Sequence, residues 1–254
     1  MKRIPGCNAV VAHVRTSAET LSNTIALQRL LNHVADLLLP QECFVCGAGS
    51  GGEAVCAACR AELPLQPQEA ACPVCALPSP GGAVCGRCLR EPPAFDTTRA
   101  LFAYAFPVDR MVQALKYHHR LALARFFADR LLELPPPEGA DLLLPMPLHA
   151  HRLRERGFNQ AAEIARPLAA AWGLPLELAT VRREREVPAQ AGLDRKARIA
   201  NLRNAFRCAR PLTGLHVVVV DDVMTTGASL NELARTLKAG GAVRVENLIV
   251  ARTP

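Results

Sequence analysis

Residues 217–230 read VVVVDDVMTTGASL. An apolar run leads into two adjacent carboxylates, and a short stretch of small and hydroxyl-bearing residues follows. An unbroken run of valines is typical of a strand buried on both faces, as in a parallel sheet. We therefore expect a strand over 217–220, with Asp221 and Asp222 emerging where the sheet meets solvent, and a helix that begins near Ser229.

Apolar runs alternate with helical periodicity on both sides of this stretch. We expect strands at 97–106, 141–144, 174–181 and 243–250, and helices at 24–39, 107–134, 157–172 and 229–239, with Asn159 as a possible cap. The segment 182–206 is polar, basic and partly helical in pattern. Strands that alternate with helices favour a largely parallel α/β sheet from about residue 95 onward.

Eight cysteines form four Cys-x2-Cys pairs, and each cysteine of the first half has a counterpart 29 residues later: Cys43, Cys46, Cys56, Cys59, Cys72, Cys75, Cys85 and Cys88. Two such pairs provide the four thiolates that structural zinc takes. This segment is poor in large apolar residues and would gain its stability from metal. We expect two structural Zn²⁺ sites, each closed within one repeat. Cross-braced pairing and redox disulfides are the alternatives.

The net charge of +7 favours anionic partners. The basic excess is concentrated in residues 150–210, although an arginine-rich composition accounts for part of it. The N-terminus lacks the apolar centre of a signal peptide, and no apolar run has the ~20 residues that a membrane span needs. We therefore expect a cytoplasmic protein without membrane insertion, with Cys7 and Cys208 as unliganded thiols.

The Asp-Asp pair and the segment after it suggest a sugar phosphate. Two adjacent carboxylates can accept hydrogen bonds from two neighbouring hydroxyls, such as those of a ribose. Thr225–Ser229 offers hydroxyls, backbone N–H groups and the positive end of a helix dipole, which together suit a phosphate. The alternative is an ordinary capped junction between a strand and a helix.

Residues 217–229 resemble the phosphoribosyl-pyrophosphate (PRPP) motif of type I phosphoribosyltransferases. The resemblance implies that Asp221 and Asp222 bind ribose and that Mg²⁺ accompanies the pyrophosphate. It assigns the 5-phosphate to the turn after them: Thr225, Thr226, Gly227, Ala228 and Ser229. Many members of that family have a second glycine where this chain has Ala228, and alanine disfavours positive φ.

A further resemblance extends over about residues 25–252. The cysteine pairs, Pro145–Leu148, the string Arg156-Gly-Phe-Asn-Gln160, Leu115-Lys-Tyr117 and the Asp-Asp motif together resemble the ComF/GntX-like competence proteins. The resemblance implies a helix and small double zinc ribbon at 25–92, and a type I phosphoribosyltransferase-like parallel sheet with helices on both faces at 93–254. Residues 1–24 are then a loose leader.

Several other residues are candidates for the pyrophosphate, with a solvated surface as the alternative: Pro147, Leu148, Arg152, Arg156 and Lys116. No base-recognition motif stands out, so the acceptor and the catalytic residues stay unassigned. The family implies DNA uptake or use of external DNA, with single-stranded DNA or a helicase of DNA uptake as partner. An active phosphoribosyltransferase and a non-catalytic PRPP sensor are the alternatives.

Overall fold

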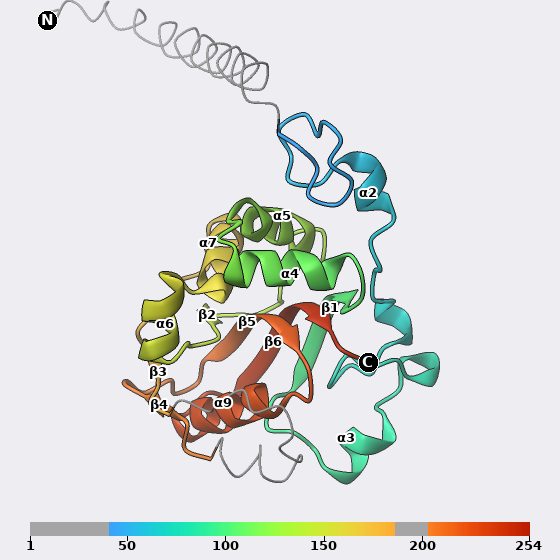
Figure 1. Ribbon diagram of the computed structural model, residues 1–254. Coiled ribbons are helices and arrows are strands. Elements are labelled where there is room, and N and C mark those ends of the chain that lie inside the picture. The colour runs from blue at the N-terminus through green and yellow to red at the C-terminus, as the bar shows by residue number, and fades with distance from the viewer. Residues whose placement is uncertain (1–40, 186–202) are drawn as a thin grey trace, which may run out of the picture. The chain divides into compact units, whose positions relative to one another are not determined.

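The computed structural model describes residues 41–185 and 203–254 (Figure 1). The predicted leader, the predicted helix over 24–39 and most of the basic segment 182–206 lie outside the described residues. The chain divides into two compact units, Met1–Ala57 and Ala58–Pro254. The predicted domain boundaries at residues 24 and 92 stay predictions.

The second unit is built around a four-stranded parallel sheet. Its strands are β1 (Thr97–Ala103), β2 (Leu142–Pro145), β5 (His216–Met224) and β6 (Arg244–Arg252), in the order β1-β6-β5-β2. The two central strands are buried along almost their whole length, as a parallel sheet covered on both faces requires. A separate antiparallel pair joins β3 (Val181–Arg183) to β4 (Phe206–Cys208).

Helices cover both faces of this sheet (Figure 1). α4 (Val108–Tyr117), α5 (Ala122–Leu131) and α7 (Gln160–Trp172) lie on one face, and α9 (Ala228–Ala239) lies on the other. The shorter elements complete the chain: α2 (Ala57–Ala61), η1 (Gln68–Ala70), η2 (Pro80–Gly82), α3 (Gly86–Arg90) and α6 (Ala150–Arg156). The predicted fold class is confirmed.

Several element boundaries differ from the sequence-based expectation, and three of the differences change the connections between elements. The predicted helix 107–134 is two helices, separated at His119, which has a φ of +54°. The predicted strand 174–181 is reduced to one bridge between Leu176 and Leu143, and β3 begins only at Val181. The chain between β2 and α7 folds into α6, which the sequence pattern did not predict. Gly157, at a φ of +76°, ends it.

The second cysteine repeat is part of the core of the sheet. Cys72, Cys75 and Cys88 are buried in the same apolar cluster as the valines of β5 and the leucines of α9. Two hydrogen bonds join this repeat to the edge strand and the segment before it. Thr98 N donates to Pro73 O at 2.9 Å, and Gln66 Nε2 donates to Ala76 O at 3.0 Å.

No helix in the described residues combines the length and the apolar character that a membrane crossing needs.

Burial predicts that the two cysteine repeats contribute differently to stability. We expect Cys72→Ser to lower the midpoint of thermal unfolding of the sheet by about 5–10 °C, because it removes a metal ligand inside the core and ~1 kcal/mol corresponds to about 2–4 °C at this size. Cys46→Ser, which changes an exposed cysteine of the first repeat, is the control and should shift this midpoint by less than about 2 °C. Circular dichroism and zinc content per chain measure both effects, and equal shifts would contradict the prediction.

Candidate functional site

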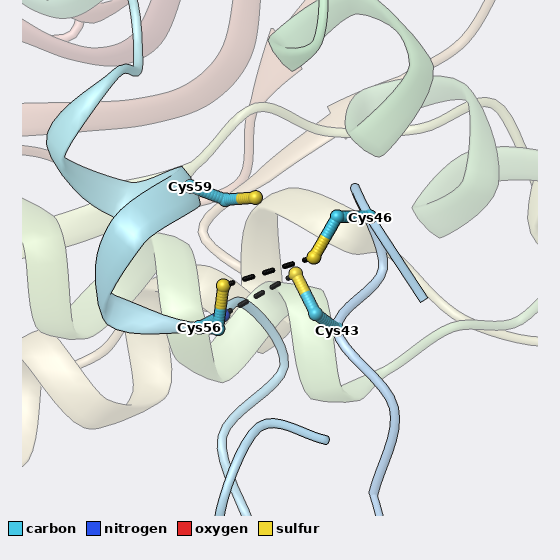
Figure 2. Close-up of side chains that lie close together, drawn as sticks. All are labelled: Cys43, Cys46, Cys56 and Cys59. Carbon is cyan, nitrogen blue, oxygen red and sulfur yellow. Dashed lines mark hydrogen bonds between the residues drawn. The ribbon is translucent and has the colours of Figure 1, made fainter. Parts of the chain in front are cut away.

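The cysteines form two tetra-cysteine clusters, each within one repeat. Figure 2 shows the first, in which Cys43, Cys46, Cys56 and Cys59 point toward one another. The second contains Cys72, Cys75, Cys85 and Cys88, and within each cluster all ligand atoms lie within 4.8 Å of one another. The predicted pairing within each repeat is confirmed, and the cross-braced alternative is wrong.

Matching contacts in the two clusters reflect the internal duplication. The Sγ atoms of Cys46 and Cys56 are 3.9 Å apart, and those of Cys75 and Cys85 are 3.7 Å apart. The amide of Cys85 donates to Cys72 Sγ at 3.3 Å, as the amide of Cys56 donates to Cys43 Sγ. Sulfurs around a tetrahedral Zn²⁺ at about 2.3 Å lie ~3.8 Å apart. Both clusters therefore fit zinc.

Asp221 and Asp222 lie inside a strand rather than beyond its end. β5 continues to Met224, and the two residues are 9% and 3% exposed. The expectation that they emerge into solvent is wrong, because β6 reaches Arg252 and continues to pair with β5 beyond Val220. The two carboxyl groups are therefore largely desolvated.

Lys116 lies against this carboxylate pair. Its Nζ is 2.9 Å from Asp222 Oδ2 and its side chain is 21% exposed. Burial lowers the pKa of Lys116, but the charge of Asp222, its hydrogen bond and the charge of Asp221 together outweigh this effect, so that the net direction is upward and the ammonium group keeps its proton. Lys116, a candidate for pyrophosphate, thus lies beside Asp222, a candidate for ribose.

The carboxyl group of Asp221 keeps its proton to a higher pH than an exposed carboxyl group. Burial raises its pKa to about 8, the neighbouring charge of Asp222 acts in the same direction, and the charge of Lys116 opposes them. The carboxyl pair beside Lys116 therefore retains one proton to a higher pH than two separate carboxyl groups would. A pair with one proton of this kind can both donate and accept hydrogen bonds.

The turn after β5 begins α9 and is open to ligands. Thr225 and Thr226 are exposed, and the Thr226 hydroxyl accepts a hydrogen bond from Ala228 N at 3.3 Å. The N-cap residue Gly227 has no side chain, so the side-chain bond to the first turn in the described residues comes from Thr226. The following N–H groups of this turn and the helix dipole favour an anion at this position.

Gly227 provides the positive φ of this turn, at +79°, and Ala228 is already helical. The alanine at 228 therefore needs no left-handed conformation, and its departure from the family motif does not distort the turn. A Cβ atom on Gly227 would lie 2.6 Å from Met224 Cε. The glycine that this backbone requires is the one at 227.

The loop after β2 lies beside the Asp-Asp strand. Met146 N donates to Val220 O at 2.8 Å, so Pro147 and Leu148 follow directly from the neighbouring strand end. Asn159 holds this loop from the other side: Oδ1 caps α7 by accepting from Ala161 N at 3.0 Å, and Nδ2 donates to Met146 O at 3.1 Å. The cap was expected, whereas the bond to Met146 requires the tertiary structure.

Two short segments that carry the family resemblance, residues 115–117 and 156–160, contact each other. The Arg156 guanidinium lies 5.4 Å from the ring centre of Tyr117 and donates to Gln160 Oε1. His119 Nε2 is 3.1 Å from Arg156 O. Arg152 lies on α6, where its Nη1 is 3.3 Å from Glu155 Oε2. The assignments of Arg152 and Arg156 to pyrophosphate stay predictions.

A cavity of about 710 Å³ adjoins the loop after β2. Pro147 and Leu148 line it together with Phe158 and Leu178, which are mainly apolar. A cavity of this size can enclose a small organic molecule.

Substituting Asp221 should remove a pH dependence of stability. Its pKa in the folded protein, about 8, lies above its unfolded value near 4, so the folded state binds the extra proton between these values and stability falls as pH rises through the window. We expect Asp221→Asn to unfold at a higher denaturant concentration than the wild type at pH 9. The difference in unfolding free energy between the variant and the wild type should be about 2–4 kcal/mol more favourable to the variant at pH 9 than at pH 5. Asp129→Asn, at a surface ion pair, is the control and should show no such trend.

Gly227 and Gly173 form a matched pair for testing the turn. Both have positive φ, at +79° and +65°, but a Cβ atom at Gly173 would meet nothing within 4 Å. We expect Gly173→Ala to cost about 1 kcal/mol from backbone strain alone, and Gly227→Ala to cost about 1–2 kcal/mol more because Met224 must move. Chemical unfolding measures both, and equal losses would show that the contact with Met224 is unimportant.

Comparisons with known proteins agree with this architecture. A family model described as a double zinc ribbon domain matches residues 34–89, and one described as a phosphoribosyl transferase domain matches residues 153–254. A glutamine PRPP amidotransferase from B. subtilis aligns with a TM-score of 0.36 at 23% identity, over 50% of this chain and 25% of that chain.

Curated relatives match most of the chain. The DNA utilization protein YhgH of Salmonella typhi is 35% identical over 172 residues, which is 64% of this chain and 74% of the relative. Competence protein F of Haemophilus influenzae is 31% identical over 173 residues, 63% of this chain and 74% of that protein. With its two tetra-cysteine clusters and parallel sheet, the chain belongs to the ComF family of competence and DNA-utilization proteins, which join a double zinc ribbon to a phosphoribosyltransferase domain.

Proposed function

We propose that this protein binds PRPP together with Mg²⁺ at the junction of β5 and α9, and that it acts in the uptake or use of DNA. One observation carries the ligand assignment. A buried carboxylate pair, beside the ammonium group of Lys116, is followed after four residues by Gly227, the N-cap residue of α9. Groups that bind a sugar diol and groups that bind a phosphate are thus separated by about one sugar.

The Asp222 carboxylate has one buried oxygen whose partner a ligand could replace. Asp222 Oδ2 is buried, and Lys116 Nζ lies 2.9 Å from it. A ribose hydroxyl that replaced the ammonium group would supply this buried acceptor with another donor. The carboxyl group of Asp221 can accept from the second hydroxyl. These residues therefore fit the sugar of PRPP.

Each part of the ligand has a candidate partner in the chain. The free N–H groups of α9 and the hydroxyls of Thr225, Thr226 and Ser229 would donate to the 5-phosphate. A ribose at Asp222 competes with Lys116 for the same oxygen. The released ammonium group would then be free to neutralise the diphosphate, as the resemblance implies for Lys116. Bound Mg²⁺ would supply the remaining positive charge on that side.

The DNA part of the proposal rests on charge and on the relatives. Residues 150–210 carry most of the basic excess, and phosphate contacts by such residues give salt-dependent binding to nucleic acid. The curated relatives are named for DNA utilization and competence. We propose single-stranded DNA, or a helicase that handles it, as the partner, and the cytoplasm as the location.

Phosphoribosyl transfer is the second candidate function, favoured by the cavity beside the loop after β2. In this reaction an acceptor nucleophile would form a bond to the anomeric carbon of ribose, pyrophosphate would leave, and the acceptor would lose a proton. The cavity of about 710 Å³ next to Pro147 and Leu148 would hold the acceptor in this case.

Calorimetric titration of PRPP with Mg²⁺ tests the ligand assignment. We expect Asp222→Ala to weaken binding by at least about 30-fold, because it removes charged hydrogen-bond acceptors from a buried site. Asp129→Ala, on the exposed face of α5, is the control and should bind like the wild type. Wild-type affinity in Asp222→Ala would contradict the assignment.

The same preparation separates the two candidate functions. Pyrophosphate release from PRPP, measured with and without single-stranded DNA, should be absent in a protein that only binds PRPP. Release that requires an added acceptor would establish transfer. Binding of single-stranded DNA should weaken steeply between 50 and 200 mM salt, by roughly tenfold or more. Binding that ignores salt would contradict a role for the basic segment.

A further inference from the structure

Arg252 is the last residue of β6, and its side chain is only 2% exposed although it carries a charge. Its guanidinium donates to backbone carbonyls. Nε donates to Cys75 O at 2.9 Å, and Nη1 donates to Met224 O at 3.0 Å and also to the carbonyls of Thr225 and Thr253. In the described part of the chain no carboxylate forms an ion pair with it. One buried cation thus joins the second tetra-cysteine cluster to the turn after β5.

The sheet fixes this position. Arg252 is paired with Met224 in the register of β5 and β6, so both residues stand at the carboxyl edge where the turn begins. The second cysteine repeat is held at the same edge by the backbone bond from Thr98 N to Pro73 O, which does not depend on the Gln66 side chain. Both ends of the connection are therefore anchored to the sheet independently of Arg252.

The chemistry of the cluster explains why a guanidinium is buried here. A Zn²⁺ ion held by four thiolates carries two net negative charges. Arg252 donates a hydrogen bond to the carbonyl of Cys75, one of the cysteines that would hold this ion. A buried cation without an ion pair is costly, and the negative charge of the cluster would reduce that cost. The guanidinium can also bond several carbonyls at fixed angles, which a lysine ammonium does less well.

A cavity separates the cluster from the turn on the side facing α9. Cys75 and Cys88 line one part of this cavity of about 380 Å³, and Thr226, Gly227 and Ala228 line another. The two sites are thus close, but solvent-accessible space lies between them there. Arg252 provides the hydrogen-bonded link.

We propose that Arg252 positions the turn at 224–229 from the second tetra-cysteine cluster, so that a metal ion in this cluster holds the turn in the conformation that accepts a phosphate. The proposal rests on the proposed function in taking this turn as the phosphate site. When the cluster is empty, Cys75 O is no longer fixed and the counter-charge of Arg252 is lost. The carbonyls of Met224 and Thr225 then lose their common donor, and the turn loosens. Arg252 itself touches no ligand and is a positioning residue.

Hydrogen–deuterium exchange of the full chain tests the proposal, with peptides covering the turn and, separately, the centres of β5 and β6. Arg252→Lys keeps the charge and should keep both zinc ions. Gln66→Met is the matched control, because it also removes a buried side-chain bond to a carbonyl of the second repeat, one residue from Cys75. Cys85→Ser empties the second cluster, and Cys46→Ser empties the first.

We expect Arg252→Lys to speed exchange of the turn by about tenfold, because one or two hydrogen bonds are lost, with zinc content and the strand peptides unchanged. Cys85→Ser should have a similar effect on the turn, and the double variant should exchange no faster than either single variant. Gln66→Met and Cys46→Ser should leave the turn as in the wild type. The affinity for PRPP with Mg²⁺ should fall in the variants whose turn is loosened.

Wild-type exchange of the turn in Arg252→Lys overturns the proposal. An additive double variant does so as well, because the cluster would then act on the turn by another route. If Cys85→Ser fails to fold, as exchange of the strand peptides would show, Arg252→Lys and Gln66→Met still decide the outcome. Failure of the proposed function looks different: the wild type then binds no PRPP, while the exchange measurements keep their expected pattern.

Discussion

The parallel pairing of β5 with β6 over their full length is the constraint on which the rest of the structure depends. It runs from His216 beside Arg244 to Met224 beside Arg252, well past Val220, where the run of four valines ends. Because the ladder extends this far, Asp221 and Asp222 are drawn inside the sheet and the turn is displaced to the carboxyl edge. The same extension brings Arg252 beside the turn. A ladder that ended at Val220 would leave a solvated acidic loop.

Burial of the carboxylate pair costs stability. Two acidic groups in a desolvated strand are unfavourable, and the chain limits the cost by protonating Asp221 and by placing Lys116 against Asp222. The proton on Asp221 and the ammonium group of Lys116 each reduce the negative charge in the buried strand. Strain of this kind is common where a protein must bind a polar ligand away from water.

Much of the fold and of the cysteine clusters could be predicted from the sequence, because each leaves a local pattern: valine runs, helical spacing and the repeated Cys-x2-Cys pairs. The site was predicted only in part. The burial of Asp221 and Asp222 depends on how far β6 extends. No pattern in the sequence of either strand predicts that length. Arg252 carries no local signal either, since its role follows from the register beside Met224 and from the approach of Cys75. Contacts between distant segments, such as Asn159 with Met146, are decided by packing.

The duplicated cysteine repeats have diverged in their surroundings while keeping their internal bonds. Three cysteines of the second cluster are buried, but only one of the first is. Chelators, oxidants and competing metal ions reach thiolates at a rate that depends on their exposure. The first ion should therefore exchange with the surroundings quickly and the second slowly. One chain would then hold a labile and a persistent metal ion in two copies of the same motif.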